Sequence, residues 1–140
     1  MKARVMVVED EIITAKAIEQ TLTSQGYDVV GTAASGEDAI TLAMQLQPDI
    51  VLMDIKLKGY IDGVFATQRI QHQMDIPVVY LTAHSDEETV KRVIHSRPYG
   101  YVIKPFRGEE LSDAIENALH RHRNLRGGAA PPTLDEAAQG

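Results

Sequence analysis

Short apolar runs alternate with segments of helical periodicity five times along the chain. Several runs are apolar at consecutive positions, which is typical of parallel strands buried on both faces of a sheet. Each run therefore predicts one strand of a parallel sheet. The expected strands cover residues 4–8, 28–33, 50–53, 78–81 and 101–103.

The segments between and after these runs carry apolar residues at helical spacing. The last segment is the clearest, with apolar positions at i, i+3, i+4, i+7 and i+8, and two shorter stripes precede it. The apolar positions are Leu111, Ala114, Ile115, Ala118 and Leu119 in the last segment, Ala39, Ile40, Ala43 and Met44 in the second, and Val90, Val93 and Ile94 in the fourth.

Helix starts are marked by residues whose side chains can cap a helix. Ser35 is expected to open the second helix and Asp62, followed by Gly63, the third. Ser85 has Glu88 three positions later, which is the form of a capping box, so the fourth helix is predicted to begin there.

Five strand–helix units predict a single α/β domain. Because strand–helix–strand crossovers are right-handed, we expect a doubly wound (βα)5 domain with helices on both faces of the sheet. From Gly127 onward the chain is rich in Gly, Ala and Pro and has one leucine, which indicates a flexible tail or a truncated linker. We expect one domain over residues 1–125 and a tail over residues 126–140.

Composition narrows the possible functions. The 140 residues are 44% hydrophobic and 24% charged, as in an ordinary globular domain. No cysteine is present, so disulfide, thiolate–zinc and thiol-nucleophile chemistry is excluded. A formal net charge of -6 gives no electrostatic reason to expect direct nucleic-acid binding. No apolar stretch approaches the ~20 residues that cross a bilayer, and the short basic start does not form a signal peptide, so we expect a cytoplasmic protein without membrane insertion.

Polar side chains follow four of the apolar runs, where each predicted strand ends. Glu9 and Asp10 follow the first run, Asp54 the third, Thr82 the fourth and Lys104 the fifth. Ligands of open parallel sheets bind beyond the carboxyl ends of the strands. The sequence therefore predicts three carboxylates, one hydroxyl and one ammonium at one rim of the sheet.

Three carboxylates at one rim need compensating positive charge. Two unit charges ~4 Å apart interact by about 4 kcal/mol at an effective dielectric constant near 20. Lys104 supplies one positive charge, and an all-oxygen donor set favours a hard cation, Mg²⁺ or Mn²⁺. Such a cation beside a carboxylate nucleophile, with a hydroxyl and an ammonium opposite, suits phosphoryl transfer to Asp54.

Five motifs in order make the chain resemble a response-regulator receiver domain of two-component signalling, over about residues 3–124. This resemblance implies a flavodoxin-like sheet with strand order 2-1-3-4-5. The motifs are Val7-Val8-Glu9-Asp10-Glu11, Leu52-Met53-Asp54-Ile55, Asp62-Gly63, Leu81-Thr82-Ala83 and Gly100-Tyr101-Val102-Ile103-Lys104-Pro105-Phe106.

The resemblance also implies roles for individual residues. Asp54 is the expected phosphoacceptor, Thr82 the hydrogen-bond donor to the phosphoryl group, and Lys104 its cationic partner. The cofactor is Mg²⁺, with Mn²⁺ as a substitute. The implied metal ligands are Glu9, which acts through water, Asp10, Asp54 and the backbone carbonyl of Lys56.

A conformational switch is implied as well. Tyr101 resembles the aromatic residue that turns inward when Thr82 is drawn to the phosphoryl group. The face of the fourth helix, fifth strand and fifth helix is expected to change with it, including Val90, Ile94, Tyr99 and Tyr101. Lys56 and His84 occupy positions that tune the lifetime of the phosphoryl group, and the Lys104-Pro105 bond is expected to be cis.

The implied role is regulatory: the domain catalyses only its own phosphorylation and dephosphorylation. The implied partners are a sensor histidine kinase or histidine phosphotransfer domain, and an output protein or domain that the sequence does not identify. The same face of the fourth helix, fifth strand and fifth helix allows a homodimer.

Three other functions remain as alternatives. A Mg²⁺-dependent phosphatase with an Asp nucleophile would have Asp-x-Asp after the strand, where this chain has Lys56 at the second position. A flavin-binding electron carrier would have a Ser/Thr/Gly-rich phosphate loop where this chain has Glu9-Asp10-Glu11-Ile12. A degenerate receiver that serves only for docking would lack the acid, Thr and Lys set.

Histidines outside this rim have simpler interpretations. His72 and His95 are expected to be ordinary surface residues. The fifth helix ends in basic residues that complement the helix dipole, and the alternatives are a contact with a partner or a helix that continues into another domain. These basic residues are His120, Arg121, His122, Arg123 and Arg126.

Overall fold

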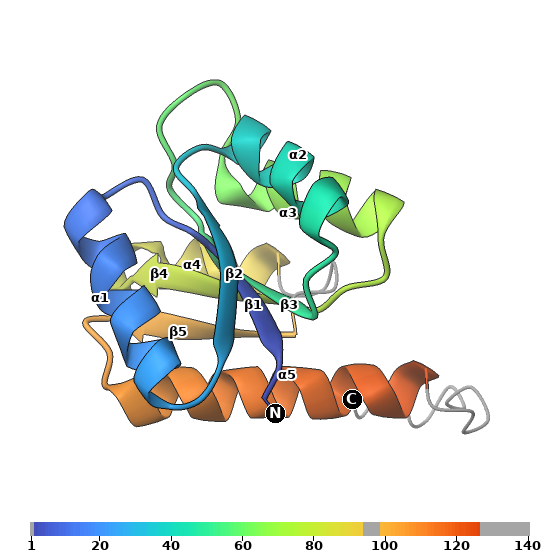
Figure 1. The fold of residues 1–140 in the computed structure, drawn as a ribbon. Helices are drawn as coiled ribbons and strands as arrows, with labels where there is room; N and C mark the ends of the chain where they lie inside the picture. The colour runs from blue at the N-terminus through green and yellow to red at the C-terminus, as the bar shows by residue number, and fades with distance from the viewer. Residues whose placement is uncertain (1, 94–98, 127–140) are drawn as a thin grey trace.

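The computed structural model describes residues 2–93 and 99–126, which form a five-stranded sheet with helices on both faces (Figure 1). The strand order is β2-β1-β3-β4-β5 and each pairing is parallel, which confirms the expected doubly wound fold and its strand order. The strands are β1 (Arg4–Val8), β2 (Asp28–Ala33), β3 (Ile50–Asp54), β4 (Val78–Ala83) and β5 (Gly100–Lys104).

Two helical layers cover the sheet and bury one apolar core on each face. Helices α2, α3 and α4 pack on one face, and α1 and α5 pack on the other (Figure 1). The helices are α1 (Ile12–Ser24), α2 (Gly36–Leu46), α3 (Gly63–Gln73), α4 (Glu87–Val93) and α5 (Gly108–Arg126), and the 3₁₀ helix η1 (His84–Asp86) precedes α4. Within the described residues, no helix combines the length and apolar character needed to cross a membrane.

Three strands are longer than the apolar runs alone predicted. Strand β3 extends to Asp54, β4 to Ala83, and β5 to Lys104. Asp54 is in register with Leu81, Thr82 with Ile103 and Lys104 with Ala83, so these polar residues lie at or next to the end of the parallel ladder. The sheet itself therefore fixes the backbone of the polar residues at its rim.

Two of the three predicted helix starts are confirmed. The Ser35 hydroxyl accepts a hydrogen bond from the backbone N–H of Asp38 at 3.1 Å. One carboxylate oxygen of Asp62 accepts from the N–H of Phe65 at 2.8 Å. Each bond satisfies one of the N–H groups that a helix leaves unpaired in its first turn.

The predicted start of α4 at Ser85 is wrong. Ser85 lies inside η1, and α4 begins at Glu87. An N-cap residue needs extended backbone, and here Ala83 takes that conformation, with φ -85° and ψ 159°. The chain has therefore already turned when it reaches Ser85.

The apolar stripe of α5 is confirmed, but its basic end is not wholly exposed. Leu111, Ile115 and Ala118 are completely buried. His122 is also buried: its Nε2 lies 3.1 Å from the carbonyl oxygen of Asp75 and 3.2 Å from Oδ1 of the same residue. The ring of Tyr99 meets His122 edge-on at 5.7 Å. Helical spacing places His122 on the same face as Ala118, which is why this member of the basic end is buried.

Candidate phosphoacceptor and metal site

The ends of β1 and β3 bring three carboxylates together. Glu9, Asp10 and Asp54 each offer one oxygen atom, and these atoms all lie within 4.8 Å of one another. Glu9 and Asp54 are buried, whereas Asp10 is partly exposed. The backbone N–H of Glu9 donates to the carbonyl of Ala33 at 3.0 Å, which fixes the chain where it leaves β1.

One ammonium group joins two of these carboxylates. Lys104 Nζ donates to Oε2 of Glu9 at 2.9 Å and to Oδ2 of Asp54 at 3.0 Å. The third carboxylate, Asp10, accepts from the backbone N–H of Lys58 at 3.1 Å. With all groups ionised, three negative charges face one positive charge.

Burial and the neighbouring negative charge both raise the pKa of Glu9. Burial, then a hydrogen bond with Asp54 and the negative charge of that group, raise the pKa of Glu9 from 4.5 to about 7, although Lys104 acts in the opposite direction. Burial alone would lower the pKa of Lys104, but its bonds to Glu9 and Asp54 outweigh burial, so its pKa is raised. The cluster thus has a deficit of positive charge.

The donor set fits a hard divalent cation. Oε1 of Glu9 is buried and has no hydrogen-bond partner among the described residues, although buried carboxylate oxygens are normally paired. The neighbouring donors are carboxylate oxygens of Asp10 and Asp54, and oxygen is the ligand atom that Mg²⁺ and Mn²⁺ prefer. Glu9, Asp10 and Asp54 therefore have the chemistry and proximity to hold Mg²⁺.

Asp54 is held by the backbone on both sides. Its Oδ1 accepts from the N–H of Lys56 at 3.1 Å, and the N–H of Ile55 donates to the carbonyl of Leu81 at 3.1 Å. The N–H of Gly63 donates to the carbonyl of Ile55 at 2.9 Å, which brings the start of α3 against β3. The backbone around Asp54 is therefore fixed, and its carboxylate is held by the N–H of Lys56 on one oxygen and by Lys104 on the other.

Gly63 has a packing role that the sequence analysis did not assign to it. A Cβ atom at this position would lie 1.9 Å from the carbonyl oxygen of Asp54, closer than any real contact. The first residue of α3 must therefore lack a side chain to approach the carboxyl end of β3. The only signal in the sequence was the position of Gly63 directly after the cap residue Asp62.

Among the described residues, no hydrogen bond joins the side chains of Thr82 and Tyr101 to the three carboxylates. Thr82 is 1% exposed, and its hydroxyl donates to the carbonyl of Ala83 at 3.2 Å. Tyr101 is partly buried against the core shared by α2, α3 and α4. Val90, which belongs to the predicted apolar stripe of the fourth helix and to the face expected to change, is completely buried in that core. Ile94 lies outside the described residues.

The two positions expected to tune the phosphoryl lifetime have different surroundings. Lys56 Nζ pairs with Oδ1 of Asp86 in η1 at 3.1 Å. The His84 side chain is 80% exposed and its Nδ1 lies 3.9 Å from Oε1 of Glu87. Asp86 was not singled out in the sequence, because no pattern of residue types connects it with Lys56. The peptide bond between Lys104 and Pro105 is cis.

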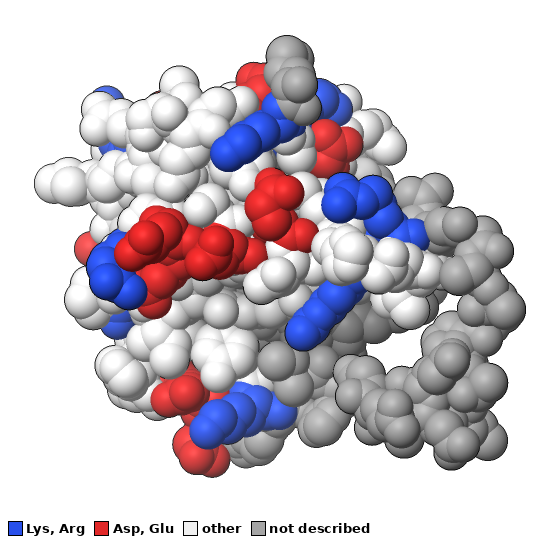
Figure 2. Space-filling model, turned by 90° about the horizontal axis from the view of Figure 1, so that it is seen from below, with Lys and Arg blue, Asp and Glu red and all other residues white. Residues whose placement is uncertain are grey.

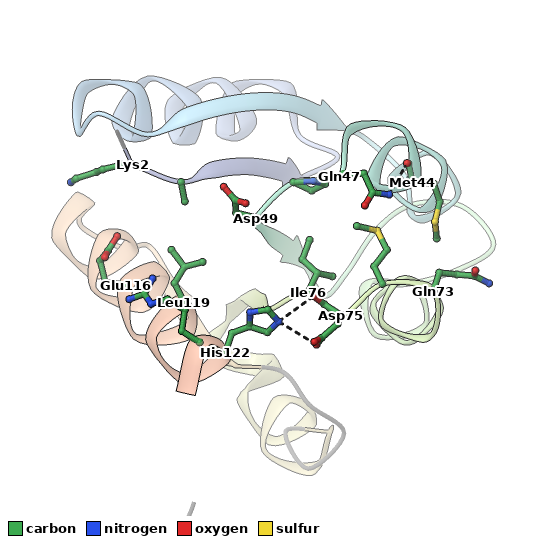
Figure 3. Close-up of a pocket in the computed structure, with 14 residues that line it drawn as sticks. Lys2, Met44, Gln47, Asp49, Gln73, Asp75, Ile76, Glu116, Leu119 and His122 are labelled. Carbon is green, nitrogen blue, oxygen red and sulfur yellow. Dashed lines mark hydrogen bonds and ion pairs between the residues drawn. The ribbon is translucent and has the colours of Figure 1, made fainter. Parts of the chain in front are cut away.

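A cavity lies at the amino end of the strands, opposite the end that carries Glu9, Asp10 and Asp54. It has a volume of about 830 Å³, and its lining includes His122, Asp75, Asp49 and Glu116 (Figure 3). The acidic groups there are paired: Asp75 with His122, Asp49 with the backbone N–H of Arg4, and Glu116 with the hydroxyl of Tyr27. Within the described part of the chain, the cluster of Glu9, Asp10 and Asp54 is the one group of three or more His, Asp or Glu residues close enough to share a metal ion.

Comparison with known proteins agrees with this chemistry. The family model described as the response regulator receiver domain matches residues 5–116. The signal receiver domain of a modulated diguanylate cyclase from Desulfovibrio desulfuricans G20 has 36% sequence identity and a TM-score of 0.82, over 89% of this chain and 98% of that one.

Curated relatives include whole transcriptional regulators. The transcriptional regulatory protein PdtaR of Mycobacterium tuberculosis is 36% identical over 87% of this chain and 59% of its own length. AfsQ1 of Streptomyces coelicolor, another transcriptional regulatory protein, is 37% identical over 83% of this chain and 51% of its own length. This chain therefore spans between half and three-fifths of the length of these relatives.

Proposed function

The chain belongs to the response regulator receiver domain family, and from this premise we propose that it is a phosphorylation-driven switch whose phosphoacceptor is Asp54. The observation that supports this most directly is the ammonium group of Lys104, which lies within 3.0 Å of both Glu9 and Asp54. A cation in this position can neutralise the oxygens of a phosphoryl group that arrives on Asp54.

The proposed reaction is an in-line transfer from a phosphohistidine. A carboxylate oxygen of Asp54 forms a bond to phosphorus while the bond from phosphorus to the histidine nitrogen breaks, and the electron pair of that bond stays on the imidazole. Lys104 then shares its hydrogen bonds between Glu9 and the new phosphoryl oxygens. Mg²⁺ bound to Glu9, Asp10 and Asp54, with the backbone carbonyl of Lys56, would supply the remaining positive charge.

The proposed partners rest on membership of this family. We infer a sensor histidine kinase or a histidine phosphotransfer domain as donor, and an output protein or domain as the target of regulation, in the cytoplasm. On the face seen from below in Figure 1, several acidic side chains lie together, and basic side chains lie at their edge and elsewhere on the face (Figure 2). A partner or a second copy at the α4–β5–α5 face is part of the same proposal. The division into a receiver over residues 1–125 and a tail over residues 126–140 also stays a proposal, and residues 127–140 lie outside the described residues.

The alternatives have less support. At the second position after Asp54, where a phosphatase would have an acid, Lys56 carries an ammonium group that pairs with Asp86. A receiver that serves only for docking would have no need of a lysine bonded to both Glu9 and Asp54.

Incubation with Mg²⁺ and a small phosphodonor such as acetyl phosphate tests the proposal. We expect intact-mass analysis to show the addition of one phosphoryl group to the wild type and to an Asp113→Asn control, because Asp113 is an exposed acid on α5. Asp54→Asn lacks the nucleophilic carboxylate and should remain unlabelled, as should the wild type in EDTA. Equal labelling of Asp54→Asn and wild type would remove Asp54 from its role.

We propose further that Thr82 and Tyr101 transmit the signal. Phosphoryl oxygens draw the Thr82 hydroxyl away from the carbonyl of Ala83, and Tyr101 fills the space left behind. NMR shifts on addition of Mg²⁺ and beryllofluoride, a phosphoryl mimic, should appear around Asp54 and also along β5 and α5. In Thr82→Ala the shifts around Asp54 should remain, and those along β5 and α5 should become much smaller. Full transmission by Thr82→Ala would contradict the coupling.

A further inference from the structure

An ion pair connects the two loops that follow β3 and β4. Lys56 lies two residues beyond Asp54, and Asp86 lies in η1, four residues beyond Thr82. Lys56 Nζ and Asp86 Oδ1 are 3.1 Å apart. The pair therefore joins the loop that follows Asp54 to the segment that follows Thr82 along the chain.

The two partners are buried to different extents. The Asp86 side chain is only 13% exposed, whereas the Lys56 side chain is 74% exposed. A largely covered carboxylate depends on its cation more than an exposed one does, because surrounding water screens it less. Among the described residues, Lys56 is the cation that the structure pairs with Asp86.

The Lys56 side chain can change partner while its backbone stays in place. The backbone N–H of Lys56 is bonded to Oδ1 of Asp54, so the residue is fixed next to the proposed phosphoacceptor. Its side chain is 74% exposed, so little packing opposes a change of its orientation. Phosphorylation would change the charge at Asp54 from −1 to about −1.5 to −2, so the attraction of the Lys56 ammonium group to this site would increase while the charge of Asp86 stays the same.

We propose that Lys56 and Asp86 form a latch between the β3–α3 loop and η1, and that Lys56 leaves Asp86 for the phosphoryl group when Asp54 is phosphorylated. Asp86 is then a positioning residue that acts through Lys56 and holds the unphosphorylated arrangement. The change of partner by Lys56 rests on the proposed function, whereas the ion pair of the unphosphorylated protein does not.

The latch predicts a specific effect on the binding of a phosphoryl mimic. In the wild type, Lys56 must give up Asp86 before it can reach the mimic. Removal of the charge in Asp86→Asn releases Lys56 in advance, so Mg²⁺–beryllofluoride should bind roughly two- to five-fold more tightly, the range of a weak to moderate ion pair. Lys56→Met loses the attraction itself and should bind more weakly than wild type.

Binding constants from isothermal titration of the full chain with Mg²⁺–beryllofluoride provide the test, for wild type, Asp86→Asn, Lys56→Met and the double variant. Asp86→Asn should have no effect in the Lys56→Met background. Glu88→Gln is the matched control, because it removes one exposed acid from the first turn of α4 and should leave the affinity unchanged. An equal gain from Asp86→Asn with and without Lys56, or an equal gain from Glu88→Gln, would show a general charge effect and overturn the latch.

A second measurement separates the latch from the proposed function. The same four proteins, unfolded by urea in EDTA, report the coupling of Lys56 and Asp86 in the resting state. A measurable coupling supports the latch, and a coupling of zero overturns it, whatever happens at Asp54. If the coupling is present but wild type fails to bind the mimic and to accept phosphoryl groups, the proposed function is wrong and the change of partner by Lys56 is wrong with it.

Discussion

The two ends of the sheet carry acidic residues in very different surroundings. At the amino end of the strands, the acids that line the large cavity have local partners, such as His122 for Asp75 and the N–H of Arg4 for Asp49. At the carboxyl end, Glu9, Asp10 and Asp54 face one ammonium group, and an oxygen of Glu9 has no partner in the described structure. The same residue types therefore stabilise the fold at one end and leave unbalanced charge at the other.

The end of the sheet with unbalanced charge is not the end with the larger cavity. The cavity at the amino end has a volume of about 830 Å³, whereas the hollow that Glu9 lines, beside α1 and the end of β2, has about 210 Å³ and does not include Asp10 or Asp54. A phosphoryl group and a metal ion need charge complementarity more than space. The proposed site therefore rests on uncompensated charge and not on cavity volume.

The largest effect on stability is expected when a methyl group is added at Gly63, next to the carboxyl end of β3. Gly63→Ala would place a Cβ 1.9 Å from the Asp54 carbonyl oxygen, so α3 or β3 must move. We expect a loss of about 3 kcal/mol or more in the free energy of unfolding, together with slower phosphorylation. The control is Gly100→Ala at the amino end of β5, where nothing lies within 4 Å of the added atom. Urea unfolding of both variants measures the difference, and equal stability would refute the close approach.

A smaller effect is expected from pH in the absence of metal. Glu9 binds a proton more tightly in the folded state, where its pKa is about 7, than in the unfolded state, where it is near 4.5. The folded state therefore carries more protons between pH 4.5 and 7, and stability should fall as pH rises through this range, by on the order of 2 kcal/mol.

Urea unfolding in EDTA at pH 5 and pH 8 checks this sign. Glu9→Gln cannot ionise and should flatten the dependence, and saturating Mg²⁺ should reduce it by favouring the ionised carboxylate. A wild-type protein that becomes more stable between these pH values would show that Glu9 is not the dominant group.

Much of the fold could be predicted from the sequence because its signals are local. Consecutive apolar positions gave the strands, and the spacing of Leu111, Ile115 and Ala118 gave the buried face of α5. The strand order came from family resemblance, since apolar periodicity carries no information about which strands are neighbours. The predicted start of α4 at Ser85 was wrong because the capping pattern is local, whereas the turn at Ala83 is set by the end of β4.

Part of the candidate site could also be predicted from the sequence. Glu9, Asp54 and Lys104 could be placed at one rim because strand ends meet there, and the structure brings them within hydrogen-bond distance. The contact of Asp86 with Lys56 and the burial of His122 depend on the exact paths of loops and helices. Neither follows from residue type or spacing alone.

The central claim is that the acids at the carboxyl end hold Mg²⁺ and those at the amino end do not. Thermal unfolding with and without Mg²⁺ tests it in three proteins: wild type, Asp10→Asn and Asp75→Asn. At ten times its dissociation constant, Mg²⁺ should stabilise wild type by about 1.4 kcal/mol, which raises Tm by roughly 4 °C. Asp75→Asn should show the same rise from its own baseline, whereas Asp10→Asn should show little or none. A rise that survives in Asp10→Asn and disappears in Asp75→Asn would place the metal at the wrong end of the sheet and contradict the account.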